Sequence, residues 1–278
     1  MSGDRIALVD GERRMTYAEL DISTNQLARA LRSLGVRQGD TVAGLLLNST
    51  AFIETMLATA KLGAVFVPMN VRLAPAEVSY LLADSGSDTF VYSAPLASVA
   101  RSALAGDGVR VRSRLIVGGE PVEGEVRYEQ VLAGGGPRSV DTDVDRRDLS
   151  CLMYTSGTTG RPKGAILTHD NHMWNVVNSL SFGRGLRESD VTVTVAPMFH
   201  IGGLGIHTLP LLYVGGTNVV LPRSIRCGPW TPCPRSEPPC SSWSRPCGRL
   251  SCRSPDSTMS TCRRWTSPCR VEHPVRSR

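Results

Sequence analysis

Residues 154–164 combine the residue types that bind phosphate groups. The segment reads YTSGTTGRPKG and holds four Ser or Thr residues, three glycines and Lys163 between two short apolar runs. Glycines let backbone N–H groups approach phosphate oxygens, hydroxyls add hydrogen-bond donors, and a lysine supplies positive charge. The pattern predicts a loop that cradles a polyphosphate. A polar glycine-rich hairpin loop without a ligand is the alternative that composition alone leaves open.

Two better-known phosphate loops do not fit this segment. Lys163 follows Gly160 by three positions and no Ser or Thr comes after it, so the segment is not a Walker A loop. No G-x-G-x-x-G pattern opens a helix, which weakens a dinucleotide-binding reading.

The sixteen residues 154–169 resemble, without a gap, the phosphate loop of the adenylate-forming superfamily, which includes acyl- and aryl-CoA synthetases. Other stretches resemble family segments in the family's order: residues 15–20, Asn48-Ser49, 61–64, 67–70 and 197–200. The last of these, Pro-Met-Phe-His, resembles an element of fatty acyl-CoA synthetases. The resemblance covers about residues 4–223 and implies an α/β fold, a partial large N-terminal domain with mainly parallel sheets flanked by helices.

The resemblance also implies a two-step reaction and its residues. A carboxylate attacks the α-phosphate of ATP in the presence of Mg²⁺, and the thiol of coenzyme A then displaces AMP from the acyl-adenylate. Thr155 is implied as a magnesium contact and His200 as a residue near the acyl pocket, where a strand-end histidine satisfied by backbone is the alternative. The residues implied to hold the phosphates are Thr155, Ser156, Gly157, Thr158, Thr159, Gly160 and Lys163.

Several other residues have a functional and a structural reading. His169 and His172 could form a metal pair, but no third ligand is suggested, so helix capping or solvent exposure is favoured. Cys151 lies in a predicted buried strand and is expected to be inert. Core packing is favoured over an acyl pocket for four apolar residues, Phe199, Ile201, Leu204 and Ile206.

The elements that would carry these residues alternate between strand and helix, which predicts a mainly parallel sheet covered on both faces. Thr16 and Glu19 form a capping-box pattern for a helix that Gly35 ends. Helices are also predicted after 48–50, from Pro75, over 170–180 and over 204–213. Strands are predicted at 41–47, 64–68, 89–92, 115–117, 150–154, 165–168, 191–196 and 217–221.

Composition divides the chain at Arg223. The last 55 residues hold seven of the eight cysteines and ten arginines and carry a charge of +7, which leaves the first 223 residues at −1. The basic average therefore does not indicate a nucleic-acid partner. We expect two parts, a partial AMP-binding domain over 1–223 and an aberrant tail rich in Cys, Arg, Pro and Ser over 224–278, which we expect to be disordered.

The family pattern stops after Arg223. The later family motifs, "GGAP", "YG.TE" and "TGD", and the C-terminal lysine are not found. A zinc module is disfavoured in the tail because its cysteines include no C-x-x-C pair. A frameshift between about Leu221 and Cys227 is the alternative, since reading one base out of register permits family-like segments such as LVPAMW and SGGAP.

These observations predict an ATP-dependent acyl-CoA synthetase by descent, with a fatty acyl substrate and with ATP, Mg²⁺ and coenzyme A, present here as an inactive, truncated fragment. A non-catalytic ATP- or phosphate-binding remnant and an aryl-CoA ligase are the alternatives. The expected partner is a small carboxylic acid, with no nucleic acid. No signal peptide or membrane-spanning run is found, so a cytoplasmic protein is expected, and peripheral membrane contact stays open.

Overall fold

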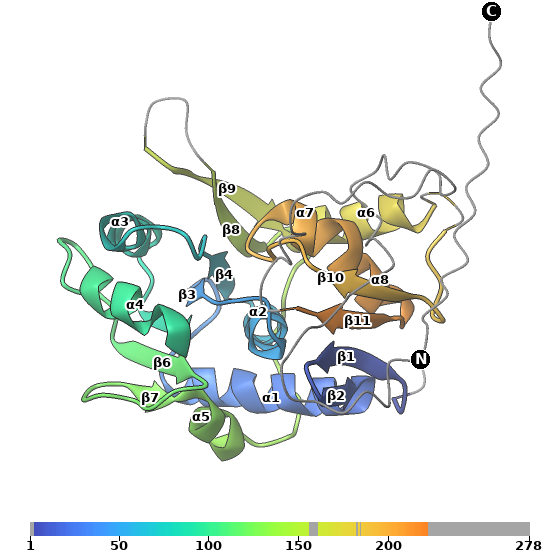
Figure 1. Cartoon of the computed structure of the whole chain (residues 1–278), viewed down its shortest axis with the longest axis horizontal. Coiled ribbons are helices and arrows are strands. Elements are labelled where there is room, and N and C mark those ends of the chain that lie inside the picture. The colour runs from blue at the N-terminus through green and yellow to red at the C-terminus, as the bar shows by residue number, and fades with distance from the viewer. Residues whose placement is uncertain (1–2, 156–160, 182, 184, 222–278) are drawn as a thin grey trace, which may run out of the picture. The chain divides into compact units, whose positions relative to one another are not determined.

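The computed structural model describes residues 3–155, 161–181, 183 and 185–221. The predicted boundary at 223/224 and the tail 224–278 lie outside these residues. In the described part, two sheets carry the fold: a four-stranded sheet in the order β10-β11-β1-β2 and a seven-stranded sheet in the order β7-β6-β5-β3-β4-β8-β9. Both sheets are mainly parallel and helices flank them (Figure 1), so the predicted α/β class is confirmed.

The chain begins in the smaller sheet. Strands β1 (Ile6–Asp10) and β2 (Arg13–Thr16) form a short antiparallel hairpin that the sequence analysis did not predict. Helix α1 (Tyr17–Ser33) starts at the predicted capping box, because Thr16 accepts from the Glu19 amide and the Glu19 carboxylate accepts from the Thr16 amide. β1 also pairs in parallel with β11 (Thr217–Val220), the last described strand, with Leu8 opposite Asn218.

The centre of the larger sheet follows the predicted alternation. Its elements are β3 (Thr41–Leu45), α2 (Thr50–Leu62), β4 (Val65–Pro68), α3 (Pro75–Ser85) and β5 (Thr89–Ser93). Ser49 caps α2, and Gly63 ends it with a φ of 64°, a left-handed conformation that favours glycine. Pro75 occupies the first turn of α3, as predicted.

The segment 94–134 folds into short elements. It contains η1 (Ala94–Leu96), α4 (Ala97–Ala103), β6 (Ser113–Val117), β7 (Val126–Arg127) and α5 (Tyr128–Gly134). Only β6 was predicted. The two helices have seven residues each, which is too short for a clear helical period in the sequence.

The remaining elements connect the two sheets along the chain. They are β8 (Leu149–Thr155), β9 (Lys163–Thr168), α6 (His169–Leu180), β10 (Val191–Thr194), α7 (Ile201–Gly203), η2 (Leu204–Thr208) and α8 (Leu209–Val214). β8 and β9 form an antiparallel hairpin at one edge of the larger sheet (Figure 1).

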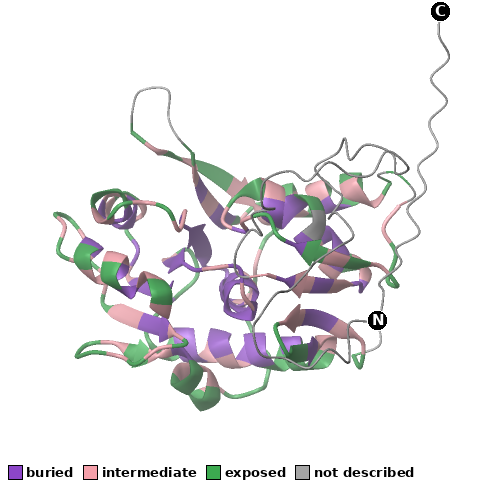
Figure 2. Ribbon diagram, viewed as in Figure 1, coloured by how far each residue is buried: buried purple, intermediate pink, exposed green. Residues whose placement is uncertain are grey.

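Buried side chains concentrate in α1, α2 and the central strands (Figure 2). One cluster contains Phe52 and Phe66, whose rings meet edge to face at 5.2 Å between centroids. The other lies under α3 and α4 and contains Phe90 and Tyr92. Both clusters consist of residues from several elements, so the described part has a substantial core.

Exposed large apolar side chains are unevenly distributed. Of fifteen in the described residues, eleven lie at or after Leu149, although this part is the shorter one. They include Ile166 on β9, Trp174 on α6 and two valines of the edge strand β10, Val191 and Val193. None of the helices in the described residues is both long and apolar enough to cross a bilayer.

Candidate functional site

The predicted phosphate-binding segment lies on the β8–β9 hairpin. Thr155, the last residue of β8, pairs with Lys163, the first residue of β9, and both residues are exposed. Arg161 is also exposed, and neither its side chain nor that of Lys163 has a hydrogen bond or ion pair with the described residues. The hairpin therefore brings a hydroxyl and an unneutralised ammonium together at one solvent-facing end.

Five predicted phosphate ligands, Ser156, Gly157, Thr158, Thr159 and Gly160, lie outside the described residues. The structure thus places two of the seven, Thr155 and Lys163, and it places them opposite each other across the hairpin.

Alternation along β8 sets the direction of the hairpin side chains. Cys151 and Met153 are buried in the cluster of Phe52 and Phe66, whereas Leu152 and Tyr154 pack against the cluster under α3. Thr155 follows Met153 by two residues, so it belongs to the Met153 face of the strand. Gly164 lies close to Leu152, because a Cβ at Gly164 would be 2.7 Å from the Leu152 Cδ1.

His200 is exposed at the start of α7, where its Nδ1 accepts a hydrogen bond of 3.2 Å from the Gly202 amide. The hydrogen bond with the backbone that a purely structural histidine would make is therefore present. The side chain also reaches solvent, so it remains open to a substrate. His200 makes no hydrogen bond with Thr155 or Lys163 in the described structure.

The segment before His200 is held by Asn48, which the sequence analysis named only in a family-like segment at a helix start. Asn48 is buried; its Nδ2 donates to the Ala196 carbonyl at 2.9 Å and its Oδ1 accepts from the Met198 amide at 2.8 Å. Gly203 then allows close approach, because a Cβ there would meet the Pro197 carbonyl oxygen at 2.2 Å. These contacts fix the turn that presents His200.

The four apolar residues around His200 divide into two groups. Leu204 is fully buried and Phe199 packs against the core, as core packing predicts. Ile201 and Ile206 are exposed, so core packing is wrong for these two. They lie on the surface beside His200 in the sequence, where an apolar substrate could contact them.

His169 and His172 occupy the first turn of α6 and are half-buried, so the expectation of solvent exposure is wrong. Thr168, not a histidine, caps the helix. The Nε2 atoms of both rings are buried without a hydrogen-bond partner in the described structure. Burial and the neighbouring His169 lower the pKa of His172 to about 4. Within the described residues, no group of three or more His, Cys, Asp or Glu side chains could hold a metal ion.

Cys151 matches its prediction. The residue is fully buried on β8 with a free thiol, and burial raises its pKa to about 12. Because the thiolate is the reactive form, this cysteine is inert at neutral pH.

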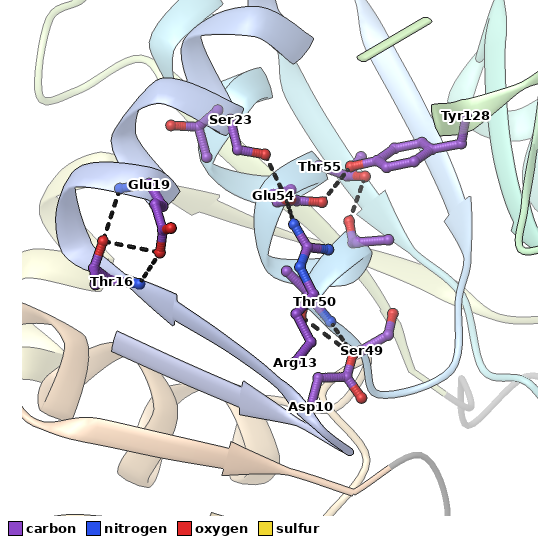
Figure 3. Close-up of polar contacts among 12 residues, drawn as sticks. Asp10, Arg13, Thr16, Glu19, Ser23, Ser49, Thr50, Glu54, Thr55 and Tyr128 are labelled. Atoms are coloured by element: carbon purple, nitrogen blue, oxygen red, sulfur yellow. Dashed lines mark hydrogen bonds and ion pairs between the residues drawn. The ribbon is translucent and has the colours of Figure 1, made fainter. Parts of the chain in front are cut away.

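A buried polar cluster lies where α1, α2, α5 and β2 meet (Figure 3). Glu54 on α2 is 1% exposed and accepts hydrogen bonds from Ser23 on α1 and from the Tyr128 hydroxyl on α5, the latter at 2.9 Å. Arg13 on β2 lies 3.5 Å from the same carboxylate. Burial and the nearby carboxylate keep the pKa of Tyr128 well above its usual value. The cluster joins four elements, and no sequence motif indicated it.

Comparison with known proteins identifies the family. The chain belongs to the AMP-binding enzyme family, whose model matches residues 1–233. A feruloyl-CoA synthase of Amycolatopsis sp is 40% identical over 220 residues, which cover 79% of this chain and 41% of that protein. The long-chain-fatty-acid–CoA ligase FadD13 of Mycobacterium tuberculosis is 37% identical over 191 residues, covering 69% and 37%. The chain spans about two fifths of the length of these relatives.

Solved structures agree with this assignment. The anthranilate CoA ligase AuaEII, in complex with anthranoyl-AMP, superposes with a TM-score of 0.72 at 30% identity, covering 79% of this chain and 42% of that one. The inhibitor-bound N-terminal domain of FACL13 from Mycobacterium tuberculosis gives 0.70 at 32% identity, covering 80% and 54%. The predicted family is confirmed, and its relatives include both acyl- and aryl-CoA ligases.

Proposed function

We propose that this chain carries the polyphosphate-binding part of an ATP-dependent acid–CoA ligase. The observation that carries the proposal is the pairing of Thr155 with Lys163 at the exposed end of the β8–β9 hairpin. The Lys163 ammonium attracts the β- and γ-phosphates of ATP, and the Thr155 hydroxyl gives a short-range contact beside it. Ser156, Gly157, Thr158, Thr159 and Gly160 complete the cradle.

The reaction of the whole enzyme is the activation of a carboxylate by ATP, followed by transfer of the acyl group to coenzyme A. A carboxylate becomes a good acyl donor once its oxygen is part of an AMP leaving group, and pyrophosphate is released in that step. Positioning and charge neutralisation dominate such a transfer. His200, presented by the turn that Asn48 fixes, lies against the acid.

Mg²⁺ fits the hairpin through Thr155. Magnesium is commonly held by one or two protein oxygens together with substrate phosphates. The exposed Thr155 hydroxyl makes no hydrogen bond with the described residues, so it is available as such an oxygen. When bound, the ion would neutralise phosphate charge.

Two acid classes are candidates. The Pro197-Met198-Phe199-His200 element favours a fatty acid, and the exposed side chains of Ile201 and Ile206 suit an apolar chain. The feruloyl-CoA synthase and the indoleacetate–CoA ligase, which is 39% identical over 218 residues, favour an aryl acid. Acid-dependent exchange of labelled pyrophosphate into ATP, measured with a fatty and an aryl panel on the protein expressed from the restored reading frame, distinguishes the two classes.

The sequence as it stands lacks the family motifs expected after Arg223, so we expect phosphate binding without complete adenylation. A frameshift between about Leu221 and Cys227 accounts for the change in composition there. Sequencing the gene tests this: removing one shift must restore a long ligase reading frame, or the explanation fails. In the restored frame the domain would extend past the boundary proposed at 223/224. The proposed setting is the cytosol.

Binding of ATP and of tripolyphosphate to the full chain tests the proposed function. Lys163→Met should weaken both by about 10-fold, as expected for loss of one charge-assisted contact. Lys61→Met is the matched control. Lys61 lies on α2, remote in sequence from the hairpin, and its Nζ lies 2.6 Å from the Asp21 Oδ1 on α1. Equal affinity of the wild type and the Lys163 variant would reject the phosphate-binding role. If the protein expressed from the restored reading frame binds ATP but exchanges pyrophosphate with no acid, the non-catalytic phosphate-binding alternative is favoured. Retention on heparin that persists after deletion of 224–278 would exclude nucleic-acid binding through the tail.

A further inference from the structure

The base of the β8–β9 hairpin is attached to α3. The Tyr154 hydroxyl on β8 donates to the Asp84 Oδ2 at 2.6 Å. The Tyr80 hydroxyl lies 3.4 Å from the carbonyl oxygen of Pro162 and 3.5 Å from the Asp84 Oδ1. Tyr154 directly precedes Thr155, and Pro162 directly precedes Lys163. Each of the two candidate phosphate contacts therefore follows a residue that α3 holds.

Neighbouring strands alone give this end of the hairpin little support. β8 pairs with β4 only at Phe66 and Cys151, so the residues of β8 after Cys151 have only β9 as a paired strand in the described structure. β9 is the edge of the sheet there. A two-stranded ribbon beyond its sheet is only marginally ordered by its own hydrogen bonds. An anchor from another element is thus needed to fix its direction.

Helix α3 is a suitable anchor because it is itself well fixed. Its N-terminus has Pro75 in the first turn and a hydrogen bond of 2.8 Å from the Ala74 amide to the Glu77 carboxylate. Val78, Leu81 and Leu82 are buried beneath it. Tyr80 and Asp84 are one helical turn apart, so both can face the hairpin from the same side.

The position of Asp84 argues against a role in stabilising its own helix. A negative charge in the last turn of a helix opposes the helix dipole, and α3 has no basic residue in that turn. Hydrogen bonds to a carboxylate are stronger than those between neutral groups. The charge of Asp84 therefore strengthens its contact with Tyr154. Burial and the Asp84 carboxylate both raise the pKa of Tyr154, which keeps its hydroxyl a donor.

We infer that Tyr80, Asp84 and Tyr154 are positioning residues that fix the base of the hairpin, so that Thr155 and Lys163 face a bound triphosphate at a set separation. This inference rests on the proposed phosphate-binding function. It assigns to α3 control over the affinity for ATP, although none of the three residues is a proposed phosphate contact.

The test compares Asp84→Asn, Tyr154→Phe and the double variant in the full chain. One readout is the rate of tryptic cleavage after Lys163, followed by mass spectrometry of the peptides, and it needs no ligand. The other is the affinity for ATP. We expect each single variant to accelerate cleavage and weaken ATP binding by about 10-fold. Asp84→Asn takes the charge from the Tyr154–Asp84 hydrogen bond and Tyr154→Phe removes that bond, so the double variant should do no more than Tyr154→Phe.

Tyr17→Phe is the matched control. The Tyr17 hydroxyl lies 2.6 Å from the Gly216 carbonyl oxygen and 3.1 Å from that of Leu212, so the variant loses a comparable hydrogen bond that does not involve the hairpin. Faster cleavage after Lys163 in Tyr17→Phe to the same extent would overturn the inference, as would wild-type cleavage and affinity in Asp84→Asn. If the wild type does not bind ATP, but cleavage is faster in Asp84→Asn and not in Tyr17→Phe, the proposed function is wrong. The attachment of the hairpin to α3 is then still supported.

Discussion

The side-chain oxygen of Asn48 accepts the backbone N–H of Met198 at 2.8 Å, across 150 residues of sequence. The same side chain donates to the Ala196 carbonyl, so one buried amide satisfies two backbone groups of the turn before His200. An amide side chain carries an acceptor oxygen and donor N–H groups on separate atoms, so it can pair with a backbone N–H and a backbone C=O at once. The start of α2 and the candidate acyl-binding turn are therefore coupled directly.

Asn48→Ala should lower the free energy of unfolding by about 2 kcal/mol, because it leaves a buried N–H and a buried C=O unpaired. Chemical denaturation measures the change. Asn178→Ala is the matched control, since Asn178 is exposed on α6. If both variants unfold at the same denaturant concentration as the wild type, Asn48 does not hold the turn.

Glu54→Ala should destabilise the fold by about 3 kcal/mol, because Ser23, Tyr128 and Arg13 all lose their shared acceptor. Thermal unfolding checks the effect. Glu123→Ala, at an exposed carboxylate of the loop before β7, should change little. A Glu54 variant as stable as the Glu123 variant would contradict a structural role for the buried cluster shown in Figure 3.

The Glu125 carboxylate should make stability depend on acid pH. Two hydrogen bonds from Arg101, at 2.8 and 2.9 Å, lower the pKa of this carboxyl from 4.5 to about 2. The folded state therefore holds the charged form more tightly than the unfolded chain does. The resulting stabilisation, on the order of 2 kcal/mol, is present above pH 4.5 and is lost as the pH falls toward 2.

Unfolding measured at pH 7 and pH 3 tests this dependence. Glu125→Gln should be less stable than the wild type at pH 7, and the gap should narrow at pH 3. Glu120→Gln is the control, because Glu120 forms an exposed pair with Arg127. A gap that stays constant with pH would show that the Glu125 charge is not the cause.

The apolar surface after Leu149 should bind hydrophobic dyes. Ile166 is 63% exposed and Trp174 is 59% exposed, on the consecutive elements β9 and α6. Replacing them by Thr and Gln should reduce dye fluorescence severalfold and slow aggregation. Ile22→Thr, at a residue 45% exposed on α1, is the matched control. An equal reduction in the Ile22 variant would mean that this surface is not distinctive.

Local signals in the sequence predicted the elements that depend on local chemistry. The capping box of Thr16 and Glu19 and the helix start at Pro75 each depend on contacts within one helical turn, and each was confirmed. The β8–β9 pairing also agrees with the strands predicted at 150–154 and 165–168 on either side of the loop. These features need no information from distant parts of the chain.

The missed features depend on partners that are distant in sequence. No local pattern around Asn48 predicts its hydrogen bond with Met198. The burial of Glu54 follows only from the packing of α1, α2 and α5 around it. The attachment of Tyr154 to Asp84 joins residues 70 positions apart. The short helix α5 forms although its own sequence has little periodicity, because it packs against α1 and buries Tyr128.

The parallel pairing of β1 with β11 can form only late during synthesis of the chain on the ribosome. Leu8 faces Asn218, so the first strand to emerge must wait for nearly the whole described sequence before its parallel neighbour exists. The larger sheet contains strands that are much closer along the chain and can assemble during synthesis. Closing so long a loop is slow, and until then β1 and β2 offer an open strand edge to chaperones or to other nascent chains.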